Sequence, residues 1–144
     1  MIFLYNLTHS KEAFDYNSIN GDISIMRCCF ICFQKNEHRL LPYWIDYHAE
    51  LSSYSSLNVF DNGSDKSMEP ILDSAEKLGV NIIRDYNSKE HFESKGRIIA
   101  IYILDLRQLN LYDFFFPLDC DEFVAASIDN EKKITITNNS SVNI

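Results

Sequence analysis

The sequence predicts an α/β fold with three layers, in which a mostly parallel sheet has helices on both faces. Short apolar runs recur along the chain, and segments whose apolar residues repeat at helical spacing separate them. This alternation of strands and helices favours right-handed crossovers and therefore a parallel sheet. The length of 144 residues suits one domain, and a hydrophobic content of 46% is enough to fill its core.

Four apolar runs are predicted strands. The first, at residues 28–33, contains no polar side chain other than cysteine thiols, as expected for a strand that is covered on both faces. The others lie at residues 57–61, 80–83 and 112–118. The second strand ends in Asp61 and the fourth leads directly into Asp119, so acidic side chains follow both.

Helices are predicted between these strands. The first has Pro42 in its first turn, where proline is favoured, and presents an apolar face that includes Trp44 and His48. On such a face we expect His48 to be a core residue with its hydrogen bonds satisfied, rather than a ligand. The second helix has Ser67 as its predicted N-cap and ends at Gly79.

A third helix is predicted from Ser94 to about Leu109. Its apolar residues lie almost all round the helix, which predicts burial on every side. Residues 84–93, which precede it, are mostly polar and predict a mobile loop that carries Lys89, Glu90 and His91.

The domain organisation follows from these elements. Residues 28–127 are expected to form the main domain, after an N-terminal extension or hairpin at residues 1–27. Residues 128–144 are expected to contain one short strand near 134–137 and a frayed tail. No apolar run is long enough for a signal peptide or a membrane span, so we expect a cytoplasmic protein without a transmembrane segment.

Charge and cysteine content exclude some functions. The net charge is −8 and the isoelectric point is about 4.8, which disfavours nucleic acid as a partner because binding to its phosphates needs clustered Lys and Arg. Cys29 and Cys32 have the CxxC spacing, but a zinc site needs a second pair. The remaining cysteines are Cys28 and Cys120, so we expect small apolar residues in the reduced state.

Polar clusters at residues 34–37, 61–65 and 119–122 follow three of the predicted strands. Because the carboxyl ends of parallel strands share one edge of a sheet, we expect these clusters to converge. Asp119 and Asp121 are one residue apart and can hold Mn²⁺ or Mg²⁺ through hard oxygen ligands. The chain has no glycine-rich dinucleotide motif, phosphate loop or nucleophile elbow, so a phosphate ligand would depend on a metal and on side chains.

Four segments occur in the order found in a known family. They are Phe33-Gln-Lys-Asn-Glu37, Leu41-Pro-Tyr-Trp-Ile-Asp-Tyr-His48, Phe60-Asp-Asn-Gly-Ser64-Asp65 and Leu118-Asp-Cys-Asp-Glu-Phe123. Together they resemble the glycosyltransferase family 2-like group, whose domain has a GT-A fold with a Rossmann-like nucleotide-binding half. The resemblance runs from about residue 28 to residue 126.

The resemblance implies a transferase that binds a nucleotide-diphosphate sugar and passes the sugar to an acceptor, such as a glycan. Asp121 would ligate Mn²⁺ or Mg²⁺ at the diphosphate, and Asp119 would lie beside it, near the ribose or donor sugar. Asp61 and Asn62 would approach the base and ribose. The implied lining of the nucleotide pocket is Lys35, Asn36 and Glu37, with Lys95 able to reach it.

Two departures from the family pattern set the alternatives. Asn62 stands where the family often has a second aspartate, which leaves the preferred base open. The segment after Phe123 has no counterpart of the acceptor-binding half, so we expect a truncated, donor-binding half with little turnover of its own. The alternatives are a degenerate, non-catalytic nucleotide-binding relative and a phosphatase of the haloacid-dehalogenase type, in which Asp119 would be the nucleophile.

Overall fold

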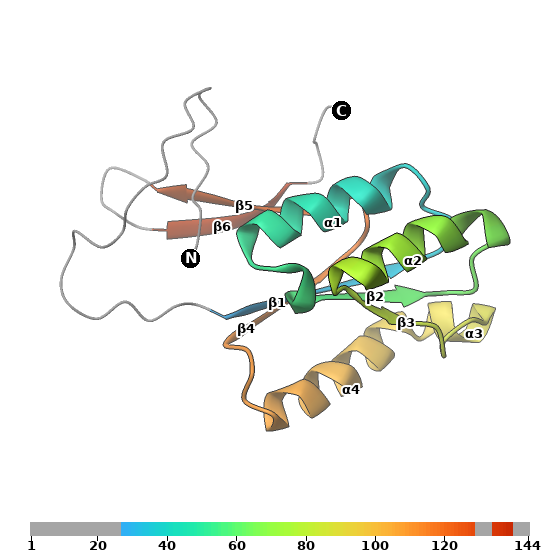
Figure 1. The fold of residues 1–144 in the computed structure, drawn as a ribbon. Helices are drawn as coiled ribbons and strands as arrows, with labels where there is room; N and C mark the ends of the chain where they lie inside the picture. Colours follow the sequence, from blue (N-terminus) through green and yellow to red (C-terminus); the bar gives the residue numbers. More distant parts are fainter. Residues whose placement is uncertain (1–26, 129–133, 140–144) are drawn as a thin grey trace.

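The computed structural model describes residues 27–128 and 134–139 (Figure 1). A parallel sheet of four strands forms the centre, in the order β3-β2-β1-β4. The α/β class and the parallel sheet predicted from the sequence are thereby confirmed. The strands are β1 (Cys28–Gln34), β2 (Leu57–Asp61), β3 (Asn81–Ile83) and β4 (Phe114–Leu118).

The register of the sheet places the polar strand ends side by side. Gln34 of β1 pairs with Asp61 of β2, and Cys32 of β1 pairs with Leu118 of β4. Since all the pairs are parallel, the segments that follow β1, β2 and β4 leave the sheet at the same edge. The chain moves from β1 to β2 on one side and returns to β4 on the other, so the strand order reverses at β1.

Two helices cover one face of the sheet, α1 (Leu40–Leu51) and α2 (Glu69–Leu78) (Figure 1). Short 3-10 helices precede β2 (Tyr54–Ser56) and α2 (Lys66–Met68). The core on this face joins the helices to the strands, because Trp44 and Leu72 belong to one buried cluster with Phe30 and Val59. Burying such side chains contributes about 1.5–3 kcal/mol each.

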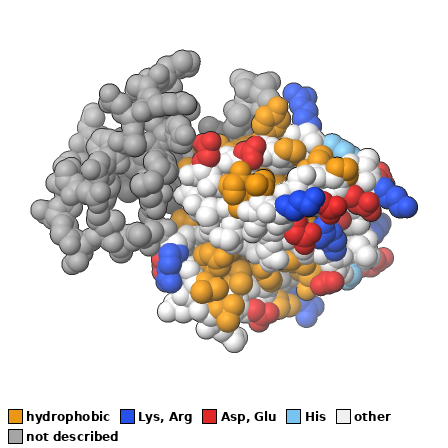
Figure 2. All heavy atoms as spheres, viewed as in Figure 1, with side chains coloured by type: hydrophobic (Ala, Val, Ile, Leu, Met, Phe, Trp, Pro, Cys, Tyr) orange, Lys and Arg blue, Asp and Glu red, His pale blue; other side chains and the backbone are white. Residues whose placement is uncertain are grey.

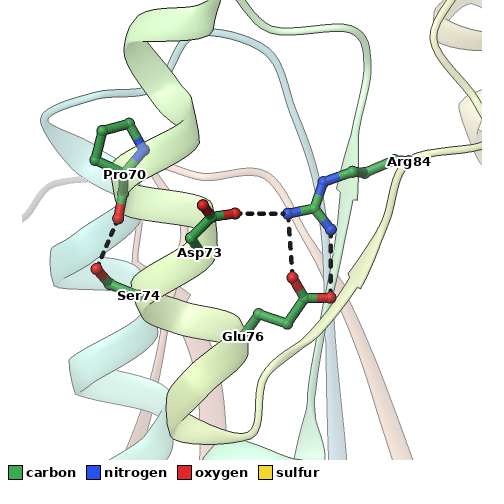
Figure 3. Close-up of polar contacts among 5 residues, drawn as sticks. All are labelled: Pro70, Asp73, Ser74, Glu76 and Arg84. Carbon is green, nitrogen blue, oxygen red and sulfur yellow. Dashed lines mark hydrogen bonds and ion pairs between the residues drawn. The ribbon is translucent and has the colours of Figure 1, made fainter.

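The end of α2 has the predicted cap. Gly79 has a φ of 105°, and this left-handed conformation is the reason that glycine ends the helix here. Arg84, just after β3, then reaches back to Asp73 at 3.4 Å and Glu76 at 3.3 Å on α2 (Figure 3). The same view shows Ser74 donating to the carbonyl oxygen of Pro70 one turn earlier, at 2.6 Å.

Helix α4 (Lys95–Gln108) packs on the opposite face of the sheet. Ile98, Tyr102 and Leu106 contact a cluster that includes Ile31 and Phe60. The prediction that this helix is buried on all sides was wrong, since no residue of α4 is fully buried and Leu104 is 56% exposed. Figure 2 shows hydrophobic side chains gathered over this helix. Apolar residues all round a helix show only its composition. The helix is buried on every side only if other elements pack against each of its faces.

Residues 89–93 also differ from the prediction, because they form the short helix α3 (Lys89–Glu93) instead of a loop. Ser88 caps it by accepting a hydrogen bond from the His91 amide at 3.2 Å, while the imidazole of His91 accepts one from the Ser88 amide at 3.4 Å. This reciprocal capping stabilises the first turn, and it places Lys89 and Phe92 on a helix at the carboxyl edge of the sheet.

A two-stranded antiparallel hairpin follows the sheet, made of β5 (Phe123–Ile128) and β6 (Ile134–Asn139). The expected strand at 134–137 is confirmed and is longer than expected, whereas its partner β5 was not among the predicted strands. The expected N-terminal hairpin, apart from residue 27, and the last five residues of the expected frayed tail lie outside the described residues.

His48 is a core residue, as predicted. It is fully buried, and its ring lies 4.8 Å from Phe30 and 5.7 Å from Phe123, measured between ring centroids. Nδ1 lies 2.8 Å from the Trp44 carbonyl oxygen, and Nε2 accepts a hydrogen bond from the Val124 amide at 3.4 Å. Burial lowers the pKa of His48 to about 4, so the ring is neutral and donates through Nδ1.

A bidentate ion pair holds the start of β4. Arg27 places Nη2 at 2.8 Å from Asp113 Oδ1 and Nε at 3.1 Å from Oδ2, and its amide donates to the same carboxylate at 3.0 Å. These hydrogen bonds from Arg27 lower the pKa of Asp113 to about 2.

No helix in the described ranges is both long enough and apolar enough to cross a membrane.

Candidate functional site

A cleft of about 670 Å³ opens at the carboxyl edge of the sheet. It lies beside the segments that follow β1 and β4, where the strand order reverses, and ligands of open α/β sheets bind at such a point. Both charge signs line it. The lining residues are Phe33, Gln34, Lys35, Asn36, Glu37, Leu40, Asn62, Lys89, Phe92, Lys95, Asp119, Cys120 and Asp121.

The segment after β1 is shaped by Asn36. Its φ of 58° is left-handed, a conformation that asparagine tolerates better than most residues. The amide of Asn36 donates to Ser64 Oγ at 2.8 Å, while its side chain accepts from the Asp65 amide at 2.7 Å and donates to the Asp65 carboxylate at 3.1 Å. These bonds join the segment after β1 to the turn after β2, and they leave the exposed Lys35 and half-buried Glu37 at the cleft.

Asp61 lies behind the cleft wall instead of lining it. Its side chain is buried and accepts hydrogen bonds from Gln34 Nε2 at 2.6 Å, from Ser64 Oγ at 2.5 Å and from the Ser64 amide at 3.2 Å. Gln34 in turn accepts from the Glu37 amide at 3.2 Å. In this arrangement Asp61 orders the two segments that form the cleft.

Asn62 lines the cleft, but both of its donor hydrogens are in use. Nδ2 donates to the carbonyl oxygens of Tyr86 at 2.6 Å and Ser88 at 2.8 Å. Asn62 therefore ties the end of β2 to the segment that leads into α3. Only its Oδ1 is left to contact a ligand, and an acceptor alone can recognise only a donor group on a base.

The turn after β4 carries the two aspartates. Lys95 Nζ lies 2.6 Å from Asp119 Oδ1, and Glu122 Oε2 accepts the Asp119 amide hydrogen at 2.8 Å. Both aspartates are exposed at the cleft. Within the described ranges, no three His, Cys, Asp or Glu side chains form a group that could hold a metal alone.

The donor chemistry of this turn suits a hard divalent cation. Two carboxylates one residue apart provide charged oxygen ligands, and Mg²⁺-like ions are commonly held by one or two carboxylates with substrate phosphates completing the shell. The lysines that line the same cleft could contact those phosphates as point charges. The aspartates would thus hold the cation, and the phosphates of the ligand would fill the remaining positions of its coordination shell.

Cys120 lies between the two aspartates but has no signature of a reactive thiol. It is buried, and so is Cys32 beneath it in the same cluster. A hydrogen bond with Cys120 and burial raise the pKa of the Cys32 thiol well above its usual value. Because its pKa is raised, the buried Cys32 thiol is a poor nucleophile and metal ligand, in agreement with the structural role expected for it.

The structure brings together the predicted site residues on the three strand-end segments and α4, with Asp61 one layer behind the others. Sequence reasoning missed the cleft positions of Lys89 and Phe92. It placed Gln34 in the polar cluster at residues 34–37 but did not foresee its bond to Asp61, which the parallel register sets beside it. Phe92 gave no usable signal, because α3 was expected to be a loop.

Comparisons of the chain with protein-family models, with curated proteins and with solved structures found no match.

Proposed function

We propose that this chain is a glycosyltransferase-like domain with a three-layer GT-A arrangement, which binds a nucleotide-diphosphate sugar through Mn²⁺ or Mg²⁺. The observation that carries the proposal is the meeting of Asn62, Lys95 and Asp121 at one cleft, although long stretches of sequence separate them. The position of the cleft, where the strand order reverses at the carboxyl edge, supports a nucleotide ligand.

The size and charge of the cleft support the same ligand class. A volume of about 670 Å³ lies within the range of roughly 300–1,000 Å³ that small-molecule sites have. Asp119 and Asp121 would hold the metal, and the metal would act as a Lewis acid on the diphosphate oxygens. The Asn62 acceptor would contact a donor edge of the base, and the aromatic ring of Phe92 provides an apolar wall.

A pair of isosteric variants tests the metal assignment. Asp121→Asn removes one charged ligand, and Glu122→Gln keeps an acceptor for the Asp119 amide while removing an equal charge next to it. We expect Asp121→Asn to weaken Mn²⁺-dependent nucleotide-sugar binding by at least about tenfold, the equivalent of about 1.4 kcal/mol. Glu122→Gln should change it far less.

The measurement is calorimetric titration with a panel of nucleoside diphosphate sugars that differ in base, with and without Mn²⁺. Equal affinities for the two variants, or binding of no member of the panel, would overturn the proposal.

A non-catalytic nucleotide-binding protein is the second candidate function. It is favoured by the small number of acidic groups at the cleft: apart from the two aspartates of the proposed metal site, Glu37 is the one carboxylate among the described lining residues. Transfer to an acceptor hydroxyl needs a general base, and Glu37 is the one described carboxylate left in the cleft for that role. Release of nucleoside diphosphate from a bound donor, followed with and without a mixture of sugar acceptors, separates transfer from binding alone.

A further inference from the structure

Lys95 engages one of the two carboxylates that the proposed metal site needs. Its Nζ lies 2.6 Å from Asp119 Oδ1, the shortest ion pair in the described part of the chain. The side chains of Lys95 and Asp119 are 34% and 55% exposed. Nζ also lies 5.3 Å from the centroid of the Phe92 ring, so the ammonium group has an aromatic face as a second support.

A cation and Lys95 compete for Asp119. A divalent ion on Oδ1 would take the oxygen that now accepts from the ammonium group, and two positive charges at ligand distance repel each other. The lysine must therefore leave Oδ1 if a metal binds there. Its flexible four-carbon stem allows this movement without a change in the backbone of α4.

The same ammonium group is a phosphate ligand once it is released. It starts from α4 at the edge of the cleft, which it lines together with Asp119 and Asp121. Phosphate oxygens that complete the shell of a metal on these aspartates would lie in the cleft that Lys95 also lines. Lys95 can therefore exchange one anionic partner for another within the same cleft.

We propose that Lys95 is an exchange residue that couples the binding of the cation to the binding of the diphosphate. It pairs with Asp119 until a divalent cation displaces it, and it then binds the phosphate oxygens. This inference rests on the function proposed above. Because coupling between two ligands is reciprocal, the cation tightens the binding of the phosphate ligand and the phosphate ligand tightens the binding of the cation.

A second lysine provides a matched control. Lys89 lines the same cleft, but its Nζ pairs with Glu93 on its own helix at 3.5 Å, and both side chains are largely exposed. Lys89→Met and Lys95→Met remove the same charge from the same cleft. Only the second variant frees a carboxylate of the proposed metal site.

The first measurement is the binding of Mn²⁺ alone, followed by the electron paramagnetic resonance signal of the free ion. Lys95→Met should bind Mn²⁺ about two- to fivefold more tightly than the unmodified protein, because a partly exposed ion pair no longer has to be broken. Lys89→Met should change the affinity less. Circular dichroism shows whether each variant is folded.

The second measurement adds inorganic pyrophosphate as the probe, with its own binding of Mn²⁺ subtracted from a protein-free titration. With Mn²⁺ present, Lys95→Met should bind pyrophosphate about tenfold more weakly than the unmodified protein, because a charge-assisted hydrogen bond is lost. The tightening of Mn²⁺ binding by pyrophosphate should be smaller in Lys95→Met than in Lys89→Met.

The outcomes separate this inference from the proposed function. If Asp121→Asn abolishes Mn²⁺ binding but Lys95→Met binds Mn²⁺ no more tightly than the unmodified protein, the exchange is refuted and the metal site stands. If Mn²⁺ binding is absent, or is the same with and without Asp121, both proposals fail. Tighter binding of Mn²⁺ together with weaker binding of pyrophosphate in Lys95→Met supports the exchange.

Discussion

The buried imidazole of His48 should make the stability of the folded protein depend on pH between about 6.5 and 4. In the folded state the ring is surrounded by Phe30, Trp44 and Phe123, and its two nitrogens are bonded to backbone groups. Protonation would place a charge among these rings and would remove the acceptor of the Val124 amide. Burial therefore lowers the pKa from 6.5 to about 4.

The size of the effect follows from linkage. Above pH 6.5 neither the folded nor the unfolded state binds the proton, so His48 has no pH effect there. As the pH falls from 6.5 to 4, only the unfolded state binds it, and the free energy of unfolding decreases. Each unit of pKa difference corresponds to about 1.4 kcal/mol, so the loss is about 2 kcal/mol at pH 5 and about 3 kcal/mol at pH 4 and below.

Urea unfolding followed by circular dichroism, at several pH values from 7.5 to 4.5, measures this loss. His48→Phe and His48→Leu should both be less stable at pH 7.5, because each removes two hydrogen bonds from the core. The stability difference between the unmodified protein and each variant should shrink by about 2 kcal/mol at pH 5. A difference that stays constant with pH in both variants would refute the assignment of a neutral, desolvated ring.

Two further predictions concern the backbone and the start of β4. Gly63→Ala should destabilise the protein by about 1–2 kcal/mol in urea unfolding, because Gly63 has a φ of 67° and a Cβ there would lie 2.9 Å from the Asn87 carbonyl oxygen. Gly96→Ala is the control, because a Cβ at this position of helix α4 meets nothing within 4 Å. In the same assay it should be neutral or stabilising by up to about 1 kcal/mol. Asp113→Asn should lower the melting temperature at pH 7, and the loss should disappear as the pH falls towards 2, because the Arg27 pair stabilises the folded state only while the carboxyl is ionised. An equal loss at both pH values would contradict the role of the ion pair.

The sheet and its carboxyl-edge cleft were predictable because periodic patterns report directly on strands and helices. The strand at 57–61 has the predicted bounds, and Gly79 ends α2 as predicted, since a left-handed residue there favours glycine. Parallel order follows from the alternation of elements, and parallel order brings the strand ends to one edge. The convergence of the segments after β1 and β4 was therefore available from the sequence.

The roles of single polar residues were less predictable, because they depend on partners that are distant in sequence. Asp61 was expected at the base and ribose of a nucleotide, whereas its carboxylate is bonded to Gln34 and Ser64. Asn62 has the expected place at the cleft, but its donor hydrogens are used by the backbone near α3. Spacing along the chain indicates where a side chain starts, and it does not indicate which neighbour takes its hydrogen bonds.

Helices α3 and α4 show the limits of composition. Residues 89–93 are few and Phe92 is the one apolar residue among them, so their helical state depends on the Ser88 cap and not on an apolar stripe. Helix α4 has apolar residues almost all round, as noted in its sequence, but it is not buried on every side. The face that carries Leu104 has no described element packed against it. In both helices the decisive factor was a local or tertiary contact that the apolar pattern does not record.

Trp44 is the single tryptophan of the chain, and its surroundings provide an optical probe without any labelling. The indole is fully buried, its Nε1 has no hydrogen-bond partner among the described residues, and its ring centroid lies 4.5 Å from that of His48. An indole in such dry surroundings emits at short wavelength, and its emission shifts to the red when water reaches it. Intrinsic fluorescence can therefore report on the opening of the α1 face of the sheet in dilute samples.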